Sequence, residues 1–408
     1  MRVLGLVSGT SFDAIEVAAA DLAAEGEELT LRPLGSLSVP YAPALARAIA
    51  AALPPAATTA EAICSLDTRI GQAFAEAAAR GAGELAGGRA DLVVSHGQTL
   101  YHQVADGRVL GTLQIGRPAW IAERTGLPVV ADLRARDVAA GGQGAPLVSL
   151  FDTLLLRGGT PRAALNLGGI ANITVLARGR EPVAFDTGPA NALLDAVVAE
   201  ATGGERRYDA GGAGAAAGTV HDGLLDVLLA EPYYAAPPPK TTGKELFGLG
   251  HVRSALAALR GDPPSGADLL ATLTRLTATT VARAIAAYEV DEVIASGGGT
   301  ANPSLMADLA AELRREAGAR LRSIEEFGIP SGAKEAYAFT VLGWLTAHGL
   351  PGTVASCTGA SGPRVLGVVV PGADGKLPSP SAAAVPPRRL RIAPVRTDPR
   401  HAGPRRPS

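Results

Sequence analysis

Two distant stretches of this 408-residue chain follow one plan, in which a short apolar run, a turn of small polar residues and a second apolar run succeed one another. The first covers residues 3–22 and the second covers residues 163–176. Apolar runs of this length around a tight turn predict paired strands. The repetition predicts two related units that face one cleft. A chance likeness of two hairpins stays open, because turns draw on few residue types.

The turn of the first stretch gathers several polar groups. It offers free backbone N–H groups, the hydroxyls of Thr10 and Ser11, and the carboxylate of Asp13. Such a turn suits a phosphate group and its magnesium ion. In an ordinary hairpin the same hydroxyls satisfy nearby backbone groups. The turn alone therefore allows a nucleotide site or a plain hairpin.

Composition narrows the class of protein. Hydrophobic residues make up 47% of the chain, charged residues 19%, and the net charge is -2, which gives no support for nucleic acid or an anionic membrane surface as a partner. No apolar run reaches the roughly 18 residues of a membrane-spanning helix, and no signal peptide fits ahead of the first strand. Cys64 and Cys357 form neither a disulfide framework nor a metal-binding spacing. We expect a cytoplasmic protein.

Predicted strands alternate with predicted helices along the rest of the chain. Strand-like runs at residues 90–95, 128–132 and 292–296 end in polar or glycine-rich loops, and helical periodicity marks residues 61–85, 267–288, 304–315 and 333–348. Alternation of this kind predicts an α/β architecture with functional groups at the strand ends. His96 and Gln98 follow the first of these strands, and Asp186 lies at the end of another predicted strand.

Residues 373–408 differ in composition from the rest. Proline, serine and alanine dominate first, and arginines follow. This pattern predicts a disordered tail. A basic tail can bind an acidic partner, although composition favours a solvated tail without a partner.

Taken together and in this order, the motifs resemble those of the anhydro-N-acetylmuramic acid kinases, which belong to the sugar kinase, heat-shock ATPase and actin superfamily. The resemblance covers residues 3–372 and rests on residues 8–13, 95–102, 139–146, 166–174, 186–189, 239–245 and 297–302, with residues 335–339 also matching. It implies two actin-like (ribonuclease H-like) α/β domains that flank an ATP and sugar cleft. Residues 1–135 with a return segment near 350–372 would form one domain. Residues 136–349 would form the other, which carries the catalytic aspartate and the adenosine-binding region.

The resemblance also implies an activity. Water opens a 1,6-anhydro sugar while the 6-oxygen accepts the γ-phosphoryl group of ATP, giving N-acetylmuramic acid 6-phosphate within cell-wall recycling. ATP and Mg²⁺ are the implied cofactors, and a homodimer is the implied assembly, without a nucleic acid or a membrane as partner. Opening the anhydro bridge needs a carboxylate that takes a proton from water, and phosphoryl transfer needs positioning and charge neutralisation.

The resemblance assigns roles residue by residue. Asp186 matches the catalytic base and also contacts the sugar. His96, Gln98, Asn172 and Glu335 are the other implied sugar-binding residues. Asp13 holds the magnesium ion, directly or through water. The implied ATP-binding residues are Gly9, Thr10, Ser11, Phe12, Asp13, Ala14, Ile15 and Glu16 in the first turn, Gly168 and Gly169 in the second, and Gly298, Gly299 and Asn302 near the adenosine.

Structural roles compete with several of these assignments. Asp186 can cap the helix that follows it, His96 can be a packed core residue, and Glu335 can stabilise a helix start through the macrodipole. Lys240 and Lys244 can be solvated loop charges or can contact nucleotide or sugar.

The chain departs from the family pattern at four positions. The family has Met, Gly, Asp and Gly where this chain has Val7, Ala14, Glu16 and Ala190. None of these changes removes a group that the chemistry needs, but they leave room for a shifted substrate. A kinase for a simpler anhydrosugar such as levoglucosan, and a non-catalytic sugar sensor on the same scaffold, are the alternative functions. The intact Asp13 and Asp186 argue against the sensor.

Overall fold

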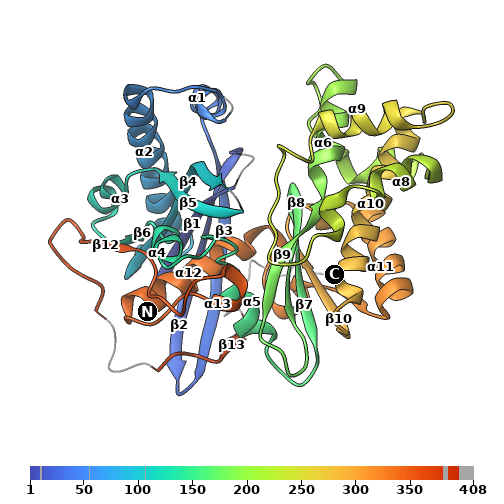
Figure 1. Cartoon of the computed structure of the whole chain (residues 1–408). Coiled ribbons are helices and arrows are strands. Elements are labelled where there is room, and N and C mark those ends of the chain that lie inside the picture. Colours follow the sequence, from blue (N-terminus) through green and yellow to red (C-terminus); the bar gives the residue numbers. More distant parts are fainter. Residues whose placement is uncertain (10–11, 55, 106, 380–384, 395–408) are drawn as a thin grey trace, which may run out of the picture.

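The computed structural model describes residues 1–9, 12–54, 56–105, 107–379 and 385–394. Within these residues the chain forms two α/β units, each built on a mixed sheet (Figure 1). The architecture predicted from the alternation of strands and helices is confirmed.

The first sheet begins with an antiparallel meander of β1 (Arg2–Ser8), β2 (Ala14–Glu25) and β3 (Glu28–Pro40). β4 (Leu92–Ala105) and then β6 (Val129–Ala131) extend the sheet in parallel from β1. β12 (Val368–Val370) closes one edge against β6, and β5 (Arg108–Ile115) forms a hairpin with β4.

The second sheet repeats this plan. β7 (Arg162–Leu167), β8 (Ile170–Leu176) and β9 (Val183–Pro189) form an antiparallel meander, and β10 (Glu292–Ser296) and β11 (Arg320–Ser323) extend it in parallel from β7. The order β3-β2-β1-β4-β6 therefore matches the order β9-β8-β7-β10-β11. The two strand–turn–strand motifs are therefore alike because the two whole units share one strand order.

Helices cover both sheets. In the first unit, the outer face packs against α1 (Pro43–Ala52), α2 (Ala60–Glu84) and α3 (Pro118–Thr125). In the second unit, α10 (Gly266–Ala286) and α11 (Pro303–Ala317) cover one face. A separate apolar cluster joins α6 (Asn191–Ala201), α8 (Asp222–Leu229) and α9 (Leu249–Ala258) to α10. The remaining helical segments are α4 (Ala135–Ala139), α5 (Ser149–Leu156), α7 (Ala213–Ala216), α12 (Lys334–Ala347), α13 (Ala355–Thr358), η1 (Ala210–Gly212), η2 (Pro232–Ala235), η3 (Gly298–Ala301), η4 (Ile324–Phe327) and η5 (Ser331–Ala333).

Helix α12 lies unusually close to the first sheet. A Cβ atom on Gly5 of β1 would lie 2.1 Å from the carbonyl oxygen of Ala336, and one on Gly343 of α12 would lie 2.0 Å from a methyl group of Val94 in β4. Glycine at both positions is thus a condition of this packing, because even one added methyl group has no space. α12 is buried on nearly all sides.

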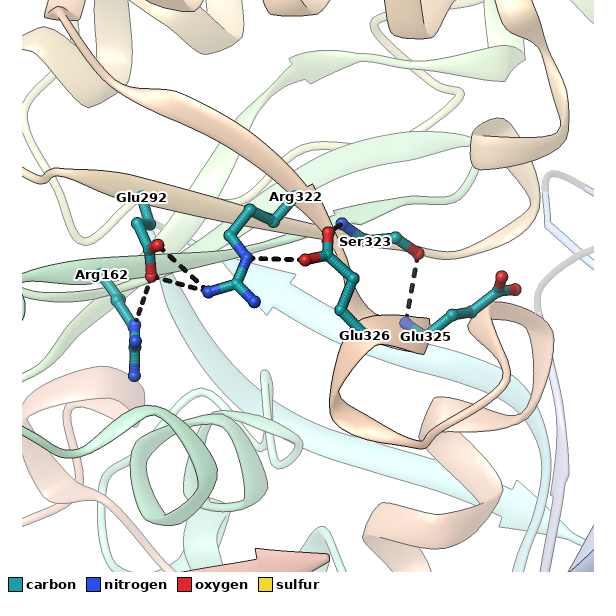
Figure 2. Close-up of polar contacts among 6 residues, drawn as sticks. All are labelled: Arg162, Glu292, Arg322, Ser323, Glu325 and Glu326. Atoms are coloured by element: carbon teal, nitrogen blue, oxygen red, sulfur yellow. Dashed lines mark hydrogen bonds and ion pairs between the residues drawn. The ribbon is translucent and has the colours of Figure 1, made fainter.

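A network of ion pairs fixes the strand starts of the second sheet (Figure 2). Glu292 at the start of β10 accepts hydrogen bonds from Arg162 Nε of β7 at 2.8 Å and from Arg322 Nη1 of β11 at 3.1 Å. Arg322 Nε also donates to Glu326, whose other oxygen accepts from the Ser323 backbone N–H at 3.0 Å. These contacts lie at the opposite ends of β7 and β10 from Asn166 and Ser296. They hold the three parallel strands in one register.

Two parts of the expected organisation are wrong. Helix α12 falls within residues 136–349, expected in the second domain, yet it packs on β1, β2 and β4 of the first sheet. Its apolar surface runs all round the helix, so periodicity could not show which sheet it joins.

The tail expected to be disordered also contains structure. Arg389–Ile392 forms β13, which pairs in parallel with β3. Leu390 is only 5% exposed, and Arg391 pairs with Glu28 at 2.7 Å. An open edge of β3 and a few apolar residues suffice to order this segment, although its composition resembles a linker. Tail residues 380–384 and 395–408 lie outside the described residues.

None of the helices in the described part of the chain is both long and apolar enough to span a membrane.

The close approach of α12 generates a stability prediction. Gly5→Ala should lower the free energy of unfolding by about 1–3 kcal/mol or more, because the backbone of α12 must move to admit the methyl group. Gly83→Ala is the matched control, since a Cβ atom there meets nothing within 4 Å near the end of α2. The control should be neutral or stabilising by up to about 1 kcal/mol. Urea unfolding of both variants measures the difference, and equal stabilities would contradict the packing described.

Candidate active site

A row of polar side chains crosses the second sheet. In the strand register, Ser296 of β10 lies opposite Asn166 of β7, Asn166 opposite Asn172 of β8, and Asn172 opposite Asp186 of β9. Directly opposed residues project from the same face of a sheet. The register therefore brings together Asn172 and Asp186, two of the predicted sugar-binding residues, and it adds Asn166, which the sequence analysis did not single out.

Asp186 is held from several sides. Its Oδ2 atom accepts a hydrogen bond from the Thr242 backbone N–H at 2.9 Å, while its backbone carbonyl accepts one from the Tyr233 hydroxyl at 2.8 Å. Burial raises the pKa of the Asp186 carboxyl to about 6, the Thr242 N–H opposes this shift, and the nearby Glu245 carboxylate adds to it. Because its carboxyl ionises near neutral pH, Asp186 can accept a proton there. It does not cap α6, which begins without a side-chain cap hydrogen bond.

The first turn joins β1 to β2, and its described part is braced from β4. Gln98 Oε1 accepts a hydrogen bond from the Ser8 hydroxyl at 2.6 Å, and Gln98 Nε2 donates to the Gly9 carbonyl at 3.3 Å. Phe12 closes the turn with a backbone hydrogen bond to Gly9 and a positive φ of 43°. The predicted residues Thr10 and Ser11 lie outside the described residues. Gln98, predicted to contact the sugar, thus has a structural task at the turn, and its sugar contact stays a prediction.

The predicted ATP-binding residues after this turn lie in strand β2. Ile15 is buried in the apolar core, and Glu16 accepts a hydrogen bond from the Ser38 hydroxyl at 2.6 Å. Burial raises the pKa of the Glu16 carboxyl, and the Ser38 hydrogen bond opposes the shift. Ala14 pairs with Pro40 at the start of β2. The side chains of Ile15 and Glu16 therefore have partners within the first unit, and their part in ATP binding stays a prediction.

Asp13 faces charged groups of the second unit. Its Oδ1 atom lies 3.5 Å from Nη1 of Arg207, and both side chains are exposed. Burial raises the pKa of Asp195, on α6, to about 6; the Lys244 ammonium opposes this shift and the Asp13 carboxylate adds to it. Charged side chains from both units thus meet beside the first turn. The sequence analysis missed Arg207 and Asp195, because only the fold brings them to Asp13.

The second turn, Gly168 and Gly169, joins β7 to β8 and is fixed by the start of α6. Asn191 Nδ2 donates to the Gly168 carbonyl at 2.7 Å, and the backbone N–H groups of Ala190 and Ala192 both donate to the Gly169 carbonyl. The Cε atom of Lys244 would lie 3.5 Å from a Cβ atom on Gly169. A cationic side chain therefore lies beside this turn, and its phosphate contact stays a prediction.

The glycine-rich loop after β10 lies next to the second turn. A Cβ atom on Gly299 would lie 2.7 Å from the Leu167 Cβ atom, whereas one on Gly298 would meet nothing within 4 Å. Asn302 is buried, and its side chain caps α11 by accepting a hydrogen bond from the Leu305 N–H at 3.1 Å. Asn302 thus caps a helix, and the space beside Gly298 is not filled by other described atoms. Adenosine contacts from all three residues stay predictions.

A cationic centre lies around Arg134, in contact with the predicted sugar-binding residue His96. Arg134 donates from Nε and Nη2 to His96 Nε2 at 3.2 and 3.1 Å, and from Nη1 to the Gly144 carbonyl at 2.7 Å. Since arginine has no acceptor, His96 Nε2 must be unprotonated. Burial, and then the Arg134 charge, hold the pKa of His96 well below its usual range. His96 is 4% exposed and stacks on Phe339 at 4.6 Å, so it orients Arg134.

Glu335 connects this centre to the polar row. Its Oε1 atom accepts a hydrogen bond from Asn166 Nδ2 at 3.4 Å. Burial raises the pKa of the Glu335 carboxyl, and the charges of Lys334 and Arg134 oppose that shift. Helix α12 packs on the first sheet, and its residue Glu335 thus contacts the second sheet. Three of the predicted sugar-binding residues, Asn172, Asp186 and Glu335, lie along this row or in contact with it.

Among the described residues, no group of three or more His, Cys, Asp or Glu side chains could enclose a metal ion. A magnesium ion needs no such cage, because it takes one or two carboxylates together with waters and phosphate oxygens. The exposed Asp13 carboxylate fits that requirement.

Comparison with known proteins identifies the family. The family model for anhydro-N-acetylmuramic acid kinase matches residues 1–372. A protein named anhydro-N-acetylmuramic acid kinase from Streptomyces avermitilis is 61% identical over 377 residues, which are 92% of this chain and 96% of that protein. A protein of the same name from Streptomyces coelicolor is 58% identical over 394 residues, 96% of this chain and 99% of that protein.

A solved structure, a ROK family glucokinase from Streptomyces griseus in complex with glucose and AMPPNP, is 15% identical, with a TM-score of 0.36 and coverage of 84% of this chain and 99% of that chain. That likeness is too remote to bear on the site. The family match and the close relatives extend over nearly the whole chain. The chain therefore belongs to the anhydro-N-acetylmuramic acid kinase family, and it is an enzyme of the kinase class.

Proposed function

We propose that this enzyme uses ATP and water to open 1,6-anhydro-N-acetylmuramic acid and to phosphorylate its 6-oxygen, which gives N-acetylmuramic acid 6-phosphate. Relatives of that kinase name at 58% and 61% identity support the substrate. The observation that carries the chemistry is Asp186, a carboxylate whose pKa of about 6 suits a general base. We place the reaction in the cytoplasmic recycling of cell-wall sugars.

The proposed reaction has two bond changes. Water attacks the anomeric carbon and loses a proton to Asp186, and the bond between that carbon and the 6-oxygen breaks. The 6-oxygen then attacks the γ-phosphorus, and ADP leaves. Asp186 Oδ2 is occupied by the Thr242 N–H, so we assign Oδ1 to the water. Holding the carboxylate by one oxygen fixes its orientation and leaves the other for chemistry.

We assign Arg134 to the carboxylate that distinguishes this sugar from simpler anhydrosugars. Its bonds to His96 and Gly144 use Nε–H and one hydrogen on each terminal nitrogen, so Nη1 and Nη2 each keep one N–H. N–H groups on both terminal nitrogens can donate to a carboxylate, and we assign them to that of the lactyl group. Glu335 interacts with this cation and Asn166 bonds Glu335, and we assign the two to hydroxyl or amide groups of the sugar.

The two turns form the proposed ATP site. We assign phosphate binding to the first turn, from Gly9 to Asp13, and to the second turn at Gly168 and Gly169, beside which Lys244 lies. Asp13 would hold Mg²⁺, with phosphate oxygens and water as its other ligands. When bound, the ion neutralises phosphate charge. The protein's own groups orient the γ-phosphoryl group toward the sugar.

Removing the base should abolish turnover. Asp186→Asn keeps the size of the side chain but cannot accept a proton, so kcat should fall by about 10²–10⁴-fold. A coupled assay of ADP release with the anhydro sugar measures this loss. Asp226→Asn, which changes an exposed carboxylate on α8, is the control and should keep normal turnover. Full turnover by Asp186→Asn would show that the proposed mechanism is wrong.

The fall of kcat/KM at acid pH should follow protonation of the Asp186 carboxylate. Only the ionised carboxylate accepts the proton, and its pKa is raised to about 6. kcat/KM should therefore rise with pH through about 6 and level off above it, with a tenfold loss per unit well below that value. A profile that stays flat between pH 5 and 7 would exclude this carboxylate as the titrating group.

Arg134 should decide between substrates. Arg134→Met removes both free N–H groups, so kcat/KM for 1,6-anhydro-N-acetylmuramic acid should fall by about 10–100-fold, as the loss of hydrogen bonds between charged groups predicts. Arg136→Met, an exposed arginine of α4, is the control. Thermal unfolding checks the fold of both. Wild-type turnover of levoglucosan alone would overturn the proposed substrate in favour of the simpler anhydrosugar.

A further inference from the structure

The segment between η2 and residue 242 runs along the free edge of the second sheet. In the described part of the chain β9 is the edge strand of this sheet, and no other described strand pairs with the outer side of Asp186. Instead, the Asp186 backbone N–H donates to the Lys240 carbonyl at 3.1 Å, and the Tyr233 hydroxyl donates to the Asp186 carbonyl at 2.8 Å. The segment thereby satisfies both backbone groups of Asp186 as well as its Oδ2 atom.

Lys240 closes this segment into a ring. Its ammonium donates to the carbonyls of Tyr233 and Tyr234, each at 3.0 Å, and lies 4.7 Å from the centre of the Tyr233 ring. Among the described residues, no carboxylate lies within ion-pair distance of it. Burial lowers the pKa of the Lys240 ammonium. A partly buried cation held by two carbonyls and an aromatic face is a structural link, unlike a fully solvated loop charge.

Aromatic packing anchors both ends of the ring to the second unit. Phe247, which follows the segment, is fully buried and stacks on Tyr234 with ring centres 5.7 Å apart. The Tyr234 ring also presses on β9, since a Cβ atom on Gly188 would lie 2.8 Å from Tyr234 Cε1. With both ends anchored, the position of Thr242 depends on how the chain between them is folded.

We propose that Lys240 is a positioning residue, which links residues 233–242 into a clamp that keeps the Thr242 N–H on Asp186 Oδ2 and so aims Oδ1 at the attacking water. This inference rests on the proposed role of Asp186 as the base. Lys240 itself touches no reacting atom. It acts through the backbone of the segment, in the way that outer groups orient catalytic side chains.

Two titratable groups interact with the charge of Asp186. They are Tyr233 on η2 and Glu245 beyond the clamp, while its neighbour across β8, Asn172, is neutral. The Thr242 N–H favours the ionised carboxylate, so losing this hydrogen bond raises the pH at which Asp186 ionises. Loss of the clamp should therefore shift the acid limb of the pH profile, whereas loss of a residue needed only for folding should not.

The test compares Lys240→Met with the wild type at several pH values. We expect kcat at pH 7 to fall about tenfold or more, the acid limb of the profile to move toward higher pH by about half a unit to one unit, and KM for ATP to stay within about twofold. Lys240→Arg retains donors for both carbonyls and should restore the wild-type limb. Lys376→Met, which alters an exposed lysine paired with Asp374, is the control and should change nothing.

Thr242→Pro provides an independent test, because it removes the N–H group and keeps Lys240. It should reproduce the shift of the acid limb even where Lys240→Met fails to fold. If Lys240→Met or Thr242→Pro folds and its acid limb is unchanged, the clamp hypothesis is wrong. If Asp186→Asn is inactive in the same experiment, the proposed function is still supported. Full activity of Asp186→Asn would instead remove the base role on which the clamp depends.

Discussion

The packing of α12 against the first sheet is the contact on which both the fold and the site depend. Glycines at positions 5 and 343 let the helix lie almost on the strands. At its start, Lys334 Nζ lies 2.6 Å from Asp152 Oδ1 of α5, and both side chains are buried. Removing one partner of a buried ion pair costs about 3–5 kcal/mol of stability, because the other charge is then left buried without a partner or solvating water. The helix start is therefore fixed between the units.

This fixed helix start explains how one residue serves both units. Glu335 follows Lys334 directly and reaches Asn166 of the second sheet. Asn166 is aligned with Asp186 by strand register alone. The ion pairs of Glu292 hold that register at the far ends of the strands (Figure 2). A displacement of either the helix or the strands would separate Glu335 from Asn166, and with it from the row that holds Asp186, the proposed base.

Much of this arrangement could be predicted from the sequence, because turns and strand ends have local signatures. The two glycine turns, the carboxylate at residue 186 and the α/β pattern all depend on neighbours in the chain. Arg134, Arg207 and Asp195 could not be found in this way, since their significance comes from partners far away in sequence. For the same reason, the sequence could not reveal that His96 and Gln98 brace other groups. The tail strand β13 was not predicted, because composition does not show that the edge of β3 is available for pairing.

The environment of Asp186 carries a cost in stability that its proposed role as a base would explain. Its pKa of about 6, against a usual 3.8, means that folding disfavours the ionised carboxylate by about 3 kcal/mol. The folded state binds this proton more tightly than the unfolded state. Asp186 therefore makes folding less favourable as the pH rises from 3.8 to about 6, and the cost is complete above that window. One backbone N–H, from Thr242, limits the cost without removing it. Further hydrogen bonds to the carboxylate would lower its pKa and stabilise the fold, but they would also make it a weaker base. Among the described residues, the Thr242 N–H is the one hydrogen-bond donor to this carboxylate, and it bonds Oδ2. This arrangement suits the proposed base, because Oδ1 stays available to take a proton.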